Sequence, residues 1–448
     1  MNVYPQLKCF VPQNLDFNII PEYKEKHKEK YIWMIHSILY KSLTSKTSFQ
    51  GYVNLNKELL VKYIGSKFYV NIKNRLIESG IIEYNKSYNP SAFSKSYRLS
   101  KKYRTAPIAC VDITKQTYCR KVYMSKSEYL RDVFKDNKLL QKEFNALTFA
   151  RIKLEDAINY INTNYDHKSQ QYKSRYVAIM QFEAMHKASL SNGSYVTDFT
   201  FIENKGRVYT PYTMLARDLE QFIYFTNHED ESTCTLDMPN SQLCFYSELI
   251  ERKKRIHIGS SDNDRNDRII RNIGFAPNHT NENIDNHNII PYVYHFSDNW
   301  DDYIFNGLGY ERMMYLSNWK GKTHGHSKEE RQEFKEEFFG QLFYNKYSDR
   351  LTDLEMIFYQ HHESTAKALR ELKKAIGNKL LAVEVQRLES IFFHKMIVGY
   401  MSKNYRNVPY LIKHDSITLP SKIACEIHDE LNKLVSDFFK CQNLKLKA

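Results

Sequence analysis

The sequence predicts a mostly helical α+β protein with more than one domain. The chain has 448 residues, of which 42% are hydrophobic and 14% aromatic, so it can bury about two to four separate cores. Long segments repeat apolar residues at helical spacing, and only short runs have the character of strands. A protein of this composition folds into packed domains and is not disordered.

Several classes of protein are excluded by the composition. No run approaches the roughly 18 apolar residues that a membrane span needs, and residues 1–16 lack the regions of a signal peptide. We therefore expect a soluble, cytoplasmic protein with no membrane partner. Its seven cysteines form no CxxC pair, which argues against disulfides and structural zinc and favours buried free thiols.

The first quarter of the chain has the element order of a small DNA-binding module. Its apolar spacing predicts three helices and then two strands, over residues 31–40, 54–64, 67–79, 81–84 and 96–99. Gly80 is placed to end the third helix, and the polar, Pro-containing segment 85–95 joins the two strands. Three helices followed by a hairpin are the plan of a winged helix, which we expect to occupy residues 1–105.

Positive charge is concentrated in this module. The chain has a net charge of +13, and residues 1–105 contain 18 Lys/Arg and 7 Asp/Glu, which leaves a local charge of +11. Such an excess favours a polyanionic partner, and the side chains expected to face phosphates are Lys67, Lys73 and Arg75 of the third helix and Lys95 and Arg98 of the wing. Two alternatives remain: an AT-rich genome enriches Lys without function, and some winged helices bind only proteins.

The middle of the chain predicts connecting structure and helices. Residues 106–125 resemble a linker with short strands, and 126–191 form a polar stretch with helical character and few Gly or Pro. The very polar segment 253–290 is typical of an exposed loop or insertion. We therefore expect the chemistry to lie outside these three segments.

Two aspartates stand at the ends of predicted strands. Residues 232–236 can form a strand that ends at Asp237, and 409–413 and 416–419 can form a hairpin with His414 and Asp415 at its tip. Two carboxylates on adjacent strand ends suit a two-metal site, whose ions lie about 3.5–4 Å apart. Taken alone, an aspartate at a strand end usually serves as a turn or cap residue.

A third signal is the strongly helical segment 327–344. Arg331, Lys335, Phe339 and Phe343 recur every four residues, which predicts two cations and two aromatic rings along one face. The cations would suit the phosphates of a nucleoside triphosphate, and the rings would suit its base and sugar. The alternative is a surface helix whose phenylalanines belong to the core.

Together these segments resemble the single-subunit polymerase superfamily, which contains family A DNA polymerases and the bacteriophage-type RNA polymerases. The matching motifs occur in the family's order over about residues 200–440, as GRVYT (206–210), LDMPNSQ (236–242), RxxxK from Arg331 and KHDSI (413–417). A weaker match is QRLES (386–390). The resemblance implies a right-hand polymerase, with thumb-like helices within 106–200 and the palm and fingers within 201–448.

The resemblance also implies a role for each matched residue. Asp237 and Asp415 would bind two Mg²⁺ ions, or Mn²⁺, while Arg331 and Lys335 would contact the triphosphate and Lys335 would protonate the leaving pyrophosphate. Phe339 and Phe343 would contact the nucleoside. The implied contacts to DNA, or to RNA, are made by His414 at the primer-terminal phosphate, Arg207 near the insertion site and Gln386 in the template or primer groove.

Three departures from the family leave the choice of sugar open. Phe343 stands where the family usually has Tyr, and Gln242 stands where the DNA enzymes carry Glu. Ser416 follows Asp415 as in the RNA enzymes. No set of exonuclease carboxylates precedes residue 200, so we expect no proofreading.

The prediction is a template-directed polymerase of a phage or mobile element that uses nucleoside triphosphates. A primase or terminal transferase with the same site is the first alternative. The second is a winged-helix replication initiator or regulator whose polymerase-like half is inert, although an inert scaffold has no physical need for clustered like charges.

Overall fold

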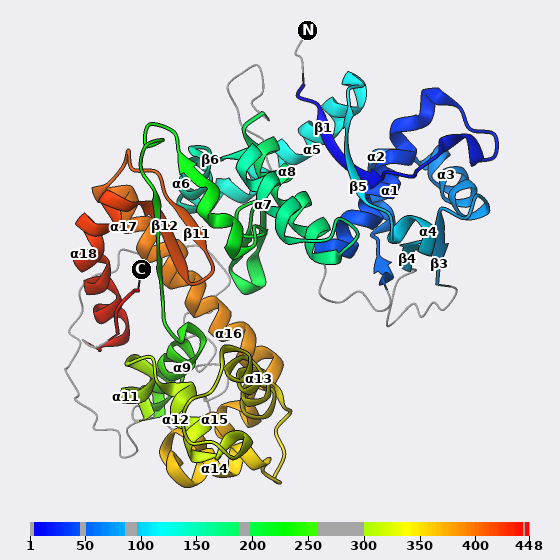
Figure 1. Ribbon diagram of the computed structural model, residues 1–448. Coiled ribbons are helices and arrows are strands. Elements are labelled where there is room, and N and C mark those ends of the chain that lie inside the picture. The colour runs from blue at the N-terminus through cyan, green and yellow to red at the C-terminus, as the bar shows by residue number, and fades with distance from the viewer. Residues whose placement is uncertain are drawn as a thin grey trace.

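The computed structural model describes residues 4–44, 51–85, 96–187, 198–257, 300–441 and 444–447 (Figure 1). Within them the protein is mostly helical, with small antiparallel sheets, so the predicted α+β class is confirmed. No helix in these ranges is long and apolar enough to cross a membrane. All seven cysteines are free, and Cys9, Cys119 and Cys244 are buried.

The N-terminal region contains the three expected helices and the two expected strands. Its helices are α1 (Lys28–Thr44), α2 (Lys57–Ile64), α3 (Ser66–Glu78) and α4 (Lys101–Arg104). Its strands are β1 (Leu7–Pro12), β2 (Val53–Asn54), β3 (Ile82–Tyr84), β4 (Ser96–Leu99) and β5 (Ile108–Ile113), with the 3-10 turns η1 (Phe17–Ile19) and η2 (Glu25–His27). Strands β2, β4 and β3 form one antiparallel sheet with β4 in the middle.

Helix α3 ends at the predicted glycine. Gly80 has a φ of +68°, its N–H donates to the carbonyl of Ile77, and the N–H of Ile81 donates to the carbonyl of Leu76. These two bonds are the Schellman arrangement, in which a left-handed glycine reverses the chain after a helix. The reversal leads directly into β3.

The segment predicted as a linker with short strands, 106–125, does contain a short strand, but it belongs to the folded core. Strand β5 pairs with β1 over six residues, from Leu7 opposite Ile113 to Pro12 opposite Ile108, and α5 begins at Gln116. This pairing joins segments about a hundred residues apart, which local sequence patterns do not reveal. The core of this half therefore runs from Leu7 to Val208 and does not stop at residue 105.

The middle region is rich in helices, as predicted for residues 126–191, of which 188–191 lie outside the described residues. It contains α5 (Gln116–Lys135), α6 (Lys138–Leu147), α7 (Leu154–Asn164), α8 (Gln170–Lys187), η4 (Glu203–Lys205) and η5 (Arg217–Phe222). Two short strand pairs complete it, β6 (Ala150–Ile152) with β9 (Ile223–Phe225) and β7 (Thr200–Ile202) with β8 (Arg207–Tyr209).

The C-terminal region holds the largest core and a second three-stranded sheet. Its strands β10 (Thr233–Asp237), β11 (Leu411–Lys413) and β12 (Ser416–Pro420) are antiparallel, with β12 in the middle. Its helices are α9 (Ser241–His257), α11 (Trp300–Phe305), α12 (Gly309–Leu316), η7 (Trp319–Gly321), α13 (Lys328–Phe339), η8 (Gly340–Tyr344), α14 (Asp353–His361), α15 (Glu363–Ile376), α16 (Asn378–Ser390), η9 (Ile391–Ile397), α17 (Val398–Asn404) and α18 (Ser421–Phe439).

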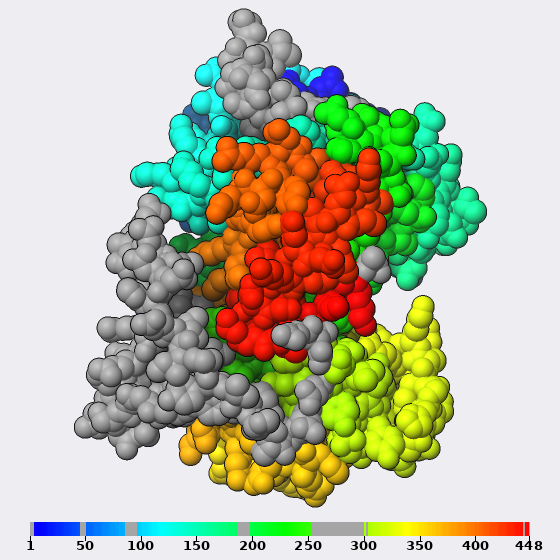
Figure 2. All heavy atoms as spheres, turned by 90° about the vertical axis from the view of Figure 1, so that its left-hand side faces the viewer, coloured from blue at the N-terminus to red at the C-terminus, as the bar shows by residue number. Residues whose placement is uncertain are grey.

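The C-terminal helices form two groups around this core. In Figure 1, α17 and α18 flank the sheet, while α11 to α15 lie below it at the far end of α16. Figure 2 shows the same division on the surface, with the orange and red C-terminal segments above the yellow ones. Helix α16 connects the two groups and packs against α9, α15 and η9.

Two predicted segments differ in detail from the structure. Helix α9 continues to His257, so the first residues of the segment predicted as an exposed loop, 253–290, are helical; the part from 258 lies outside the described residues. The helix predicted for 327–344 starts with a capping box between Ser327 and Glu330, but its last turn, η8, is a π-helix.

Candidate active site

Asp237 and Asp415 lie side by side at one edge of the C-terminal sheet. Asp237 is the last residue of β10 and stands opposite Ser416 of β12. Asp415 is the second residue of the two-residue turn between β11 and β12, and its carbonyl accepts a 3.0 Å bond from the N–H of Met238. The sheet therefore brings together two acids that are far apart in the sequence.

The turn that carries Asp415 is held in an unusual conformation. His414 has a φ of +53°, a left-handed value that a residue with a side chain adopts at a cost. Ser241, the first residue of α9, donates its hydroxyl to Asp415 Oδ2. Backbone and side chain of Asp415 are thus both fixed.

The C-terminal end of the described chain also fixes Asp237. The N–H of Asp237 donates to the carbonyl of Lys447 at 2.7 Å, and the N–H of Lys447 returns a 2.8 Å bond to the carbonyl of Asp237. Leu444 and Leu446 beside this bridge are buried in the C-terminal core. Lys447 therefore forms an isolated antiparallel bridge with Asp237, which adds a backbone contact at the end of β10.

The two acids interact electrostatically. Burial and the negative charge of Asp415 together raise the pKa of Asp237 to about 6, although the positive charge of Arg217 acts in the opposite direction. Arg217 lies 4.0 Å from Asp237 Oδ2 and its side chain is 86% exposed, so it compensates little of the charge. The pair is therefore a place where a bound cation would be stabilised.

Oxygen ligands of this kind fit Mg²⁺ or Mn²⁺. Among the described residues, no three His, Cys, Asp or Glu side chains converge as a ligand set. Mg²⁺ is commonly held by one or two carboxylates, with water and substrate oxygens completing its shell. Asp237 and Asp415 would be the residues that hold it.

Beside the acids, Arg207 connects the predicted residue His414 with Glu389, a residue that the sequence did not single out. Its guanidinium Nη1 lies 3.0 Å from His414 Nδ1, and Nη2 lies 2.7 Å from Glu389 Oε1. Burial and the charge of Arg207 lower the pKa of His414 to about 4, so the ring is neutral and Nδ1 accepts. Burial raises the pKa of Glu389 to about 7 although Arg207 is adjacent.

Two of the matched motifs, GRVYT (206–210) and QRLES (386–390), contact each other. Gly206 has a φ of +67°, and a Cβ placed on it would lie 2.6 Å from Ser390 Oγ. Ser390 donates its hydroxyl to the carbonyl of Gly206, and Arg387 Nε donates to the carbonyl of Asn204 at 2.7 Å. Segments 206–210 and 386–390 thus form one unit that positions Arg207.

Gln386 and Gln242 occupy different settings near this unit. Gln386 precedes Arg387 on α16, and its Oε1 is buried without a hydrogen-bond partner among the described residues. Gln242 lies in the first turn of α9, directly after Ser241, and is half-buried.

On α13 the two predicted cations share one aromatic ring. The guanidinium of Arg331 lies 5.1 Å and Lys335 Nζ 5.5 Å from the ring centre of Tyr310. Arg331 Nε also donates to Glu311 at 2.6 Å. The cations therefore lie on the same face, as predicted, although Arg331 already has an acidic partner.

The phenylalanines of the predicted stripe point into the core. Phe339 and Phe343 are 3% and 2% exposed, and the ring of Phe343 lies 4.0 Å from that of Tyr246. The expectation that these rings face an open nucleotide site is therefore wrong for this conformation. The physical reason is that their aromatic area is better buried against Tyr246 than left in water.

A residue missed by the sequence analysis stands next to them. Tyr344, the last residue of the π-helix η8, is 48% exposed, and partial burial raises its pKa, while the nearby charges of Arg207 and Glu389 act on it in opposite directions. It therefore lies close to the Arg207 unit. The sequence signal was present, because Tyr344 directly follows Phe343, but a regular helix gave no reason to prefer it.

The predicted DNA-contacting residues of α3 are not equivalent. Lys67 is exposed, whereas Lys73 is half-buried. Arg75 donates to both the carbonyl and the carboxylate of Glu22, so it joins α3 to the N-terminal segment. Arg98 of β4 pairs with Glu83 at 2.7 Å and stacks on Tyr52, and Lys95 lies outside the described residues.

Comparison with known proteins adds no family. No protein-family model matches the chain, and no curated protein shows significant sequence similarity to it.

Proposed function

We propose that this chain is a nucleotidyltransferase that extends a nucleic-acid strand with the help of two divalent metal ions. The observation that carries the proposal is the placement of Asp237 and Asp415 on adjacent strand ends, with the pKa of Asp237 raised by burial and by its neighbour. A catalytically inert scaffold would gain nothing from such mutual repulsion.

In this proposal the C-terminal region is a right-hand polymerase. The sheet β10-β12-β11 corresponds to the palm, α13 with its neighbours to the fingers, and the helices of the middle region to the thumb. Bound Mg²⁺ would activate the attacking 3′-hydroxyl and neutralise charge on the phosphates. The proposed substrates are nucleoside triphosphates and a primed template strand of DNA or RNA.

The residues around the acids support this chemistry. The neutral ring of His414 and the cation Arg207, which hold each other in place, would contact a strand beside the acids. Lys335 would meet the triphosphate and supply a proton to pyrophosphate. Sugar selection would depend on Gln242 and Tyr344, because Tyr344 is exposed where Phe343 is buried.

We further propose that α1 to α3 with β2 to β4 form a winged helix that binds DNA. The supporting observations are the order of the elements, the three-stranded sheet and the local charge of +11. In a winged helix that binds proteins only, substitution of Lys67 would leave DNA affinity and its salt dependence unchanged.

The experiment is nucleotide incorporation by the full chain on a primed template, with Mg²⁺ and with NTPs or dNTPs. Asp415→Asn should reduce incorporation by about 10³-fold or more, because one metal-binding carboxylate is lost. The matched control is Asp429→Asn, which changes a fully exposed acid of α18. A folded Asp415→Asn protein with full activity would overturn the proposal.

The same assay distinguishes the alternatives. A primase would act without a primer, and a terminal transferase would act without a template, both with the same dependence on Asp415. An inert initiator or regulator would show no incorporation by either the wild type or the variant while still binding DNA.

A further inference from the structure

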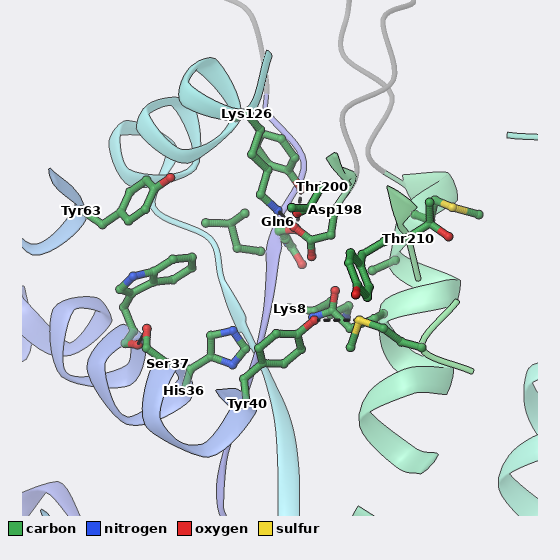
Figure 3. Close-up of a pocket in the computed structure, with 18 residues that line it drawn as sticks. Gln6, Lys8, His36, Ser37, Tyr40, Tyr63, Lys126, Asp198, Thr200 and Thr210 are labelled. Atoms are coloured by element: carbon green, nitrogen blue, oxygen red, sulfur yellow. Dashed lines mark hydrogen bonds and ion pairs between the residues drawn. The ribbon is translucent and has the colours of Figure 1, made fainter. Parts of the chain in front are cut away.

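A cavity of about 370 Å³ lies between the N-terminal and middle regions (Figure 3). One side is made by β1, α1 and α5, and the other by α8, β7 and β8. Its volume falls near the lower end of the range of small-molecule sites, about 300–1,000 Å³. The cavity is separate from Asp237 and Asp415, which do not line it.

Aromatic rings form much of its wall. They come from four elements that are distant in sequence, and they are Trp33, Tyr40, Tyr63, Tyr123 and Tyr209. On α1, Trp33, Ser37 and Tyr40 are four and three residues apart and therefore share one face of the helix. Rings arranged around a cavity suit a flat, aromatic ligand.

The charges at the cavity are compensated within the protein. Lys8 lies 2.7 Å from Asp112, and Lys126 forms an ion pair with Asp198. The two lysines are thus engaged by acids and leave little net charge for a ligand. The lining therefore favours a neutral ligand with hydrogen-bonding groups.

His36 offers one such group. Its Nδ1 accepts a 3.0 Å bond from the N–H of Phe10, and burial lowers the pKa of its ring to about 4. The neutral ring must then carry its proton on Nε2, for which no partner is found among the described residues. His36 is 8% exposed and lines the cavity beside Tyr40, so it can donate to a ligand there (Figure 3).

We propose that this cavity binds one unpaired nucleobase of the strand that passes the candidate active site. The link is Tyr209, which lines the cavity and whose ring lies edge-on to His414 at 6.4 Å. Strand β8 carries both Arg207 and Tyr209, so the strand contact and the cavity wall belong to one element. A nucleobase is flat, neutral and rich in hydrogen-bonding groups.

This inference rests on the proposed function, because that function supplies the strand. A free nucleotide carries the same base, so the experiment must separate these two sources. The two negative charges of a free monophosphate find no uncompensated lysine in the cavity, which favours a base held by a strand whose phosphates lie outside.

The test is photocrosslinking of the full chain to primer-templates that contain one 5-iodouracil. The base is placed in turn at each unpaired template position and at the primer end, and crosslinked peptides are identified by mass spectrometry. We expect crosslinks to Trp33, Tyr40, Tyr209 or Met214 from one or two adjacent positions only. Crosslinks confined to other parts of the chain would overturn the proposal.

A second arm uses Ala184, which lines the cavity from α8. Ala184→Trp should fill the cavity and lower the crosslink yield at least tenfold, while Ala184→Ser, the matched control, should retain it. Crosslinking of the unaltered protein does not depend on the folding of either variant. Equal yields from Ala184→Trp and Ala184→Ser, with both proteins folded, would contradict the assignment.

A third arm replaces the oligonucleotide by free 5-iodouridine monophosphate. Crosslinking as efficient as that of the strand would overturn the assignment to a strand and identify a nucleotide effector site. The failure of the proposed function is distinguishable: absence of incorporation together with a mapped crosslink removes the polymerase and leaves the base site.

Discussion

The protein contains two charged regions of opposite sign, and they are built differently. At the C-terminal sheet, Asp237, Asp415 and Arg207 are each fixed by partners from distant segments. On α3, the exposed Lys67 has no such framework, and Arg75 is already paired with Glu22. The first region is organised for a fixed geometry, and the second offers long-range attraction, which is additive and screened by salt.

The hairpins show the same contrast. Strands β11 and β12 are joined by the two residues His414 and Asp415, whereas 11 residues separate Tyr84 of β3 from Ser96 of β4. In a two-residue turn, the paired strands on both sides fix the backbone of the turn and therefore the position of a carboxylate that it carries. Substitutions should therefore have large effects in the first region and small effects in the second.

The largest expected effect after loss of an acid concerns Lys335. Lys335→Ala should reduce the rate of incorporation by about 10²-fold with little change in template affinity, because the proposed function gives Lys335 a charge contact made in the transition state. The control is Lys328→Ala, an exposed lysine in the first turn of the same helix. Unchanged turnover would show that the cations of α13 only pack on Tyr310.

Gly206 tests the framework of Arg207 without altering a charge. Gly206→Ala introduces a left-handed alanine, which costs about 1–2 kcal/mol, and a clash with Ser390, which costs about 1–3 kcal/mol more. The control Gly321→Ala has a similar φ, +71°, and no atom within 4 Å of the added Cβ. Thermal unfolding and incorporation should both fall more for Gly206→Ala, and equal effects would show that Ser390 gives way.

The acid pair predicts a specific response to pH. The folded-state pKa of Asp237, about 6, lies above the ordinary value of about 3.9, so its ionisation opposes folding in the metal-free protein. The stability of the metal-free folded protein that depends on the protonated Asp237 carboxyl is fully present below about pH 4. It is lost as the pH rises through about 6. Mg²⁺ needs the ionised pair, so its stabilising effect should grow over the same interval.

This response is measured as the shift of Tm by excess Mg²⁺ at about pH 5 and about pH 8. The wild type should show a clearly larger shift at the higher pH. In Asp237→Asn the shift of Tm by Mg²⁺ should be small at both pH values. Glu384 and Glu389, whose pKa values are about 7, titrate in the wild type and in the variant alike, so their effect cancels when the two proteins are compared. A shift that is independent of pH would remove Asp237 from the metal site.

The smallest effect belongs to the basic module. Lys67→Ala should weaken binding of duplex DNA a few-fold at low salt. It should also reduce the slope of the logarithm of DNA affinity against the logarithm of salt concentration by about one. Arg75→Ala should instead lower stability, because it breaks the contact with Glu22. A Lys67 effect as large as that of Lys335 would end the contrast between the two regions.

Local patterns predicted the local structure. The helices α1 to α3, the ending at Gly80 and the strands around Asp237 and Asp415 follow from apolar spacing and turn residues, which depend on neighbours in sequence. The pairing of β1 with β5 was not predicted, because nothing in residues 106–125 marks a partner a hundred residues away.

The candidate site shows the same limit. The position of each acid and of Arg207 was predicted, but not the contact of Gly206 with Ser390 or the proton state of His414, since both arise from tertiary packing. The role expected for Phe339 and Phe343 was wrong because a periodic pattern shows which residues share a helix face but not whether that face is buried. In the π-helix at Gly340–Tyr344, the side chain of Phe343 is buried and that of Tyr344 is exposed, a difference that a regular helical pattern does not predict.

The short pairing of Lys447 with Asp237 has a practical side. An affinity tag joined immediately after Lys447 would disturb the backbone hydrogen bonds of Asp237, a proposed catalytic residue. A tag before Tyr4 would lie far from Asp237 in sequence and in the fold (Figure 1). Preparations that differ only in which end carries the tag should then differ in the proposed nucleotide incorporation. Removal of residues 444–447 would take away both backbone hydrogen bonds between Lys447 and Asp237, together with the buried side chains of Leu444 and Leu446.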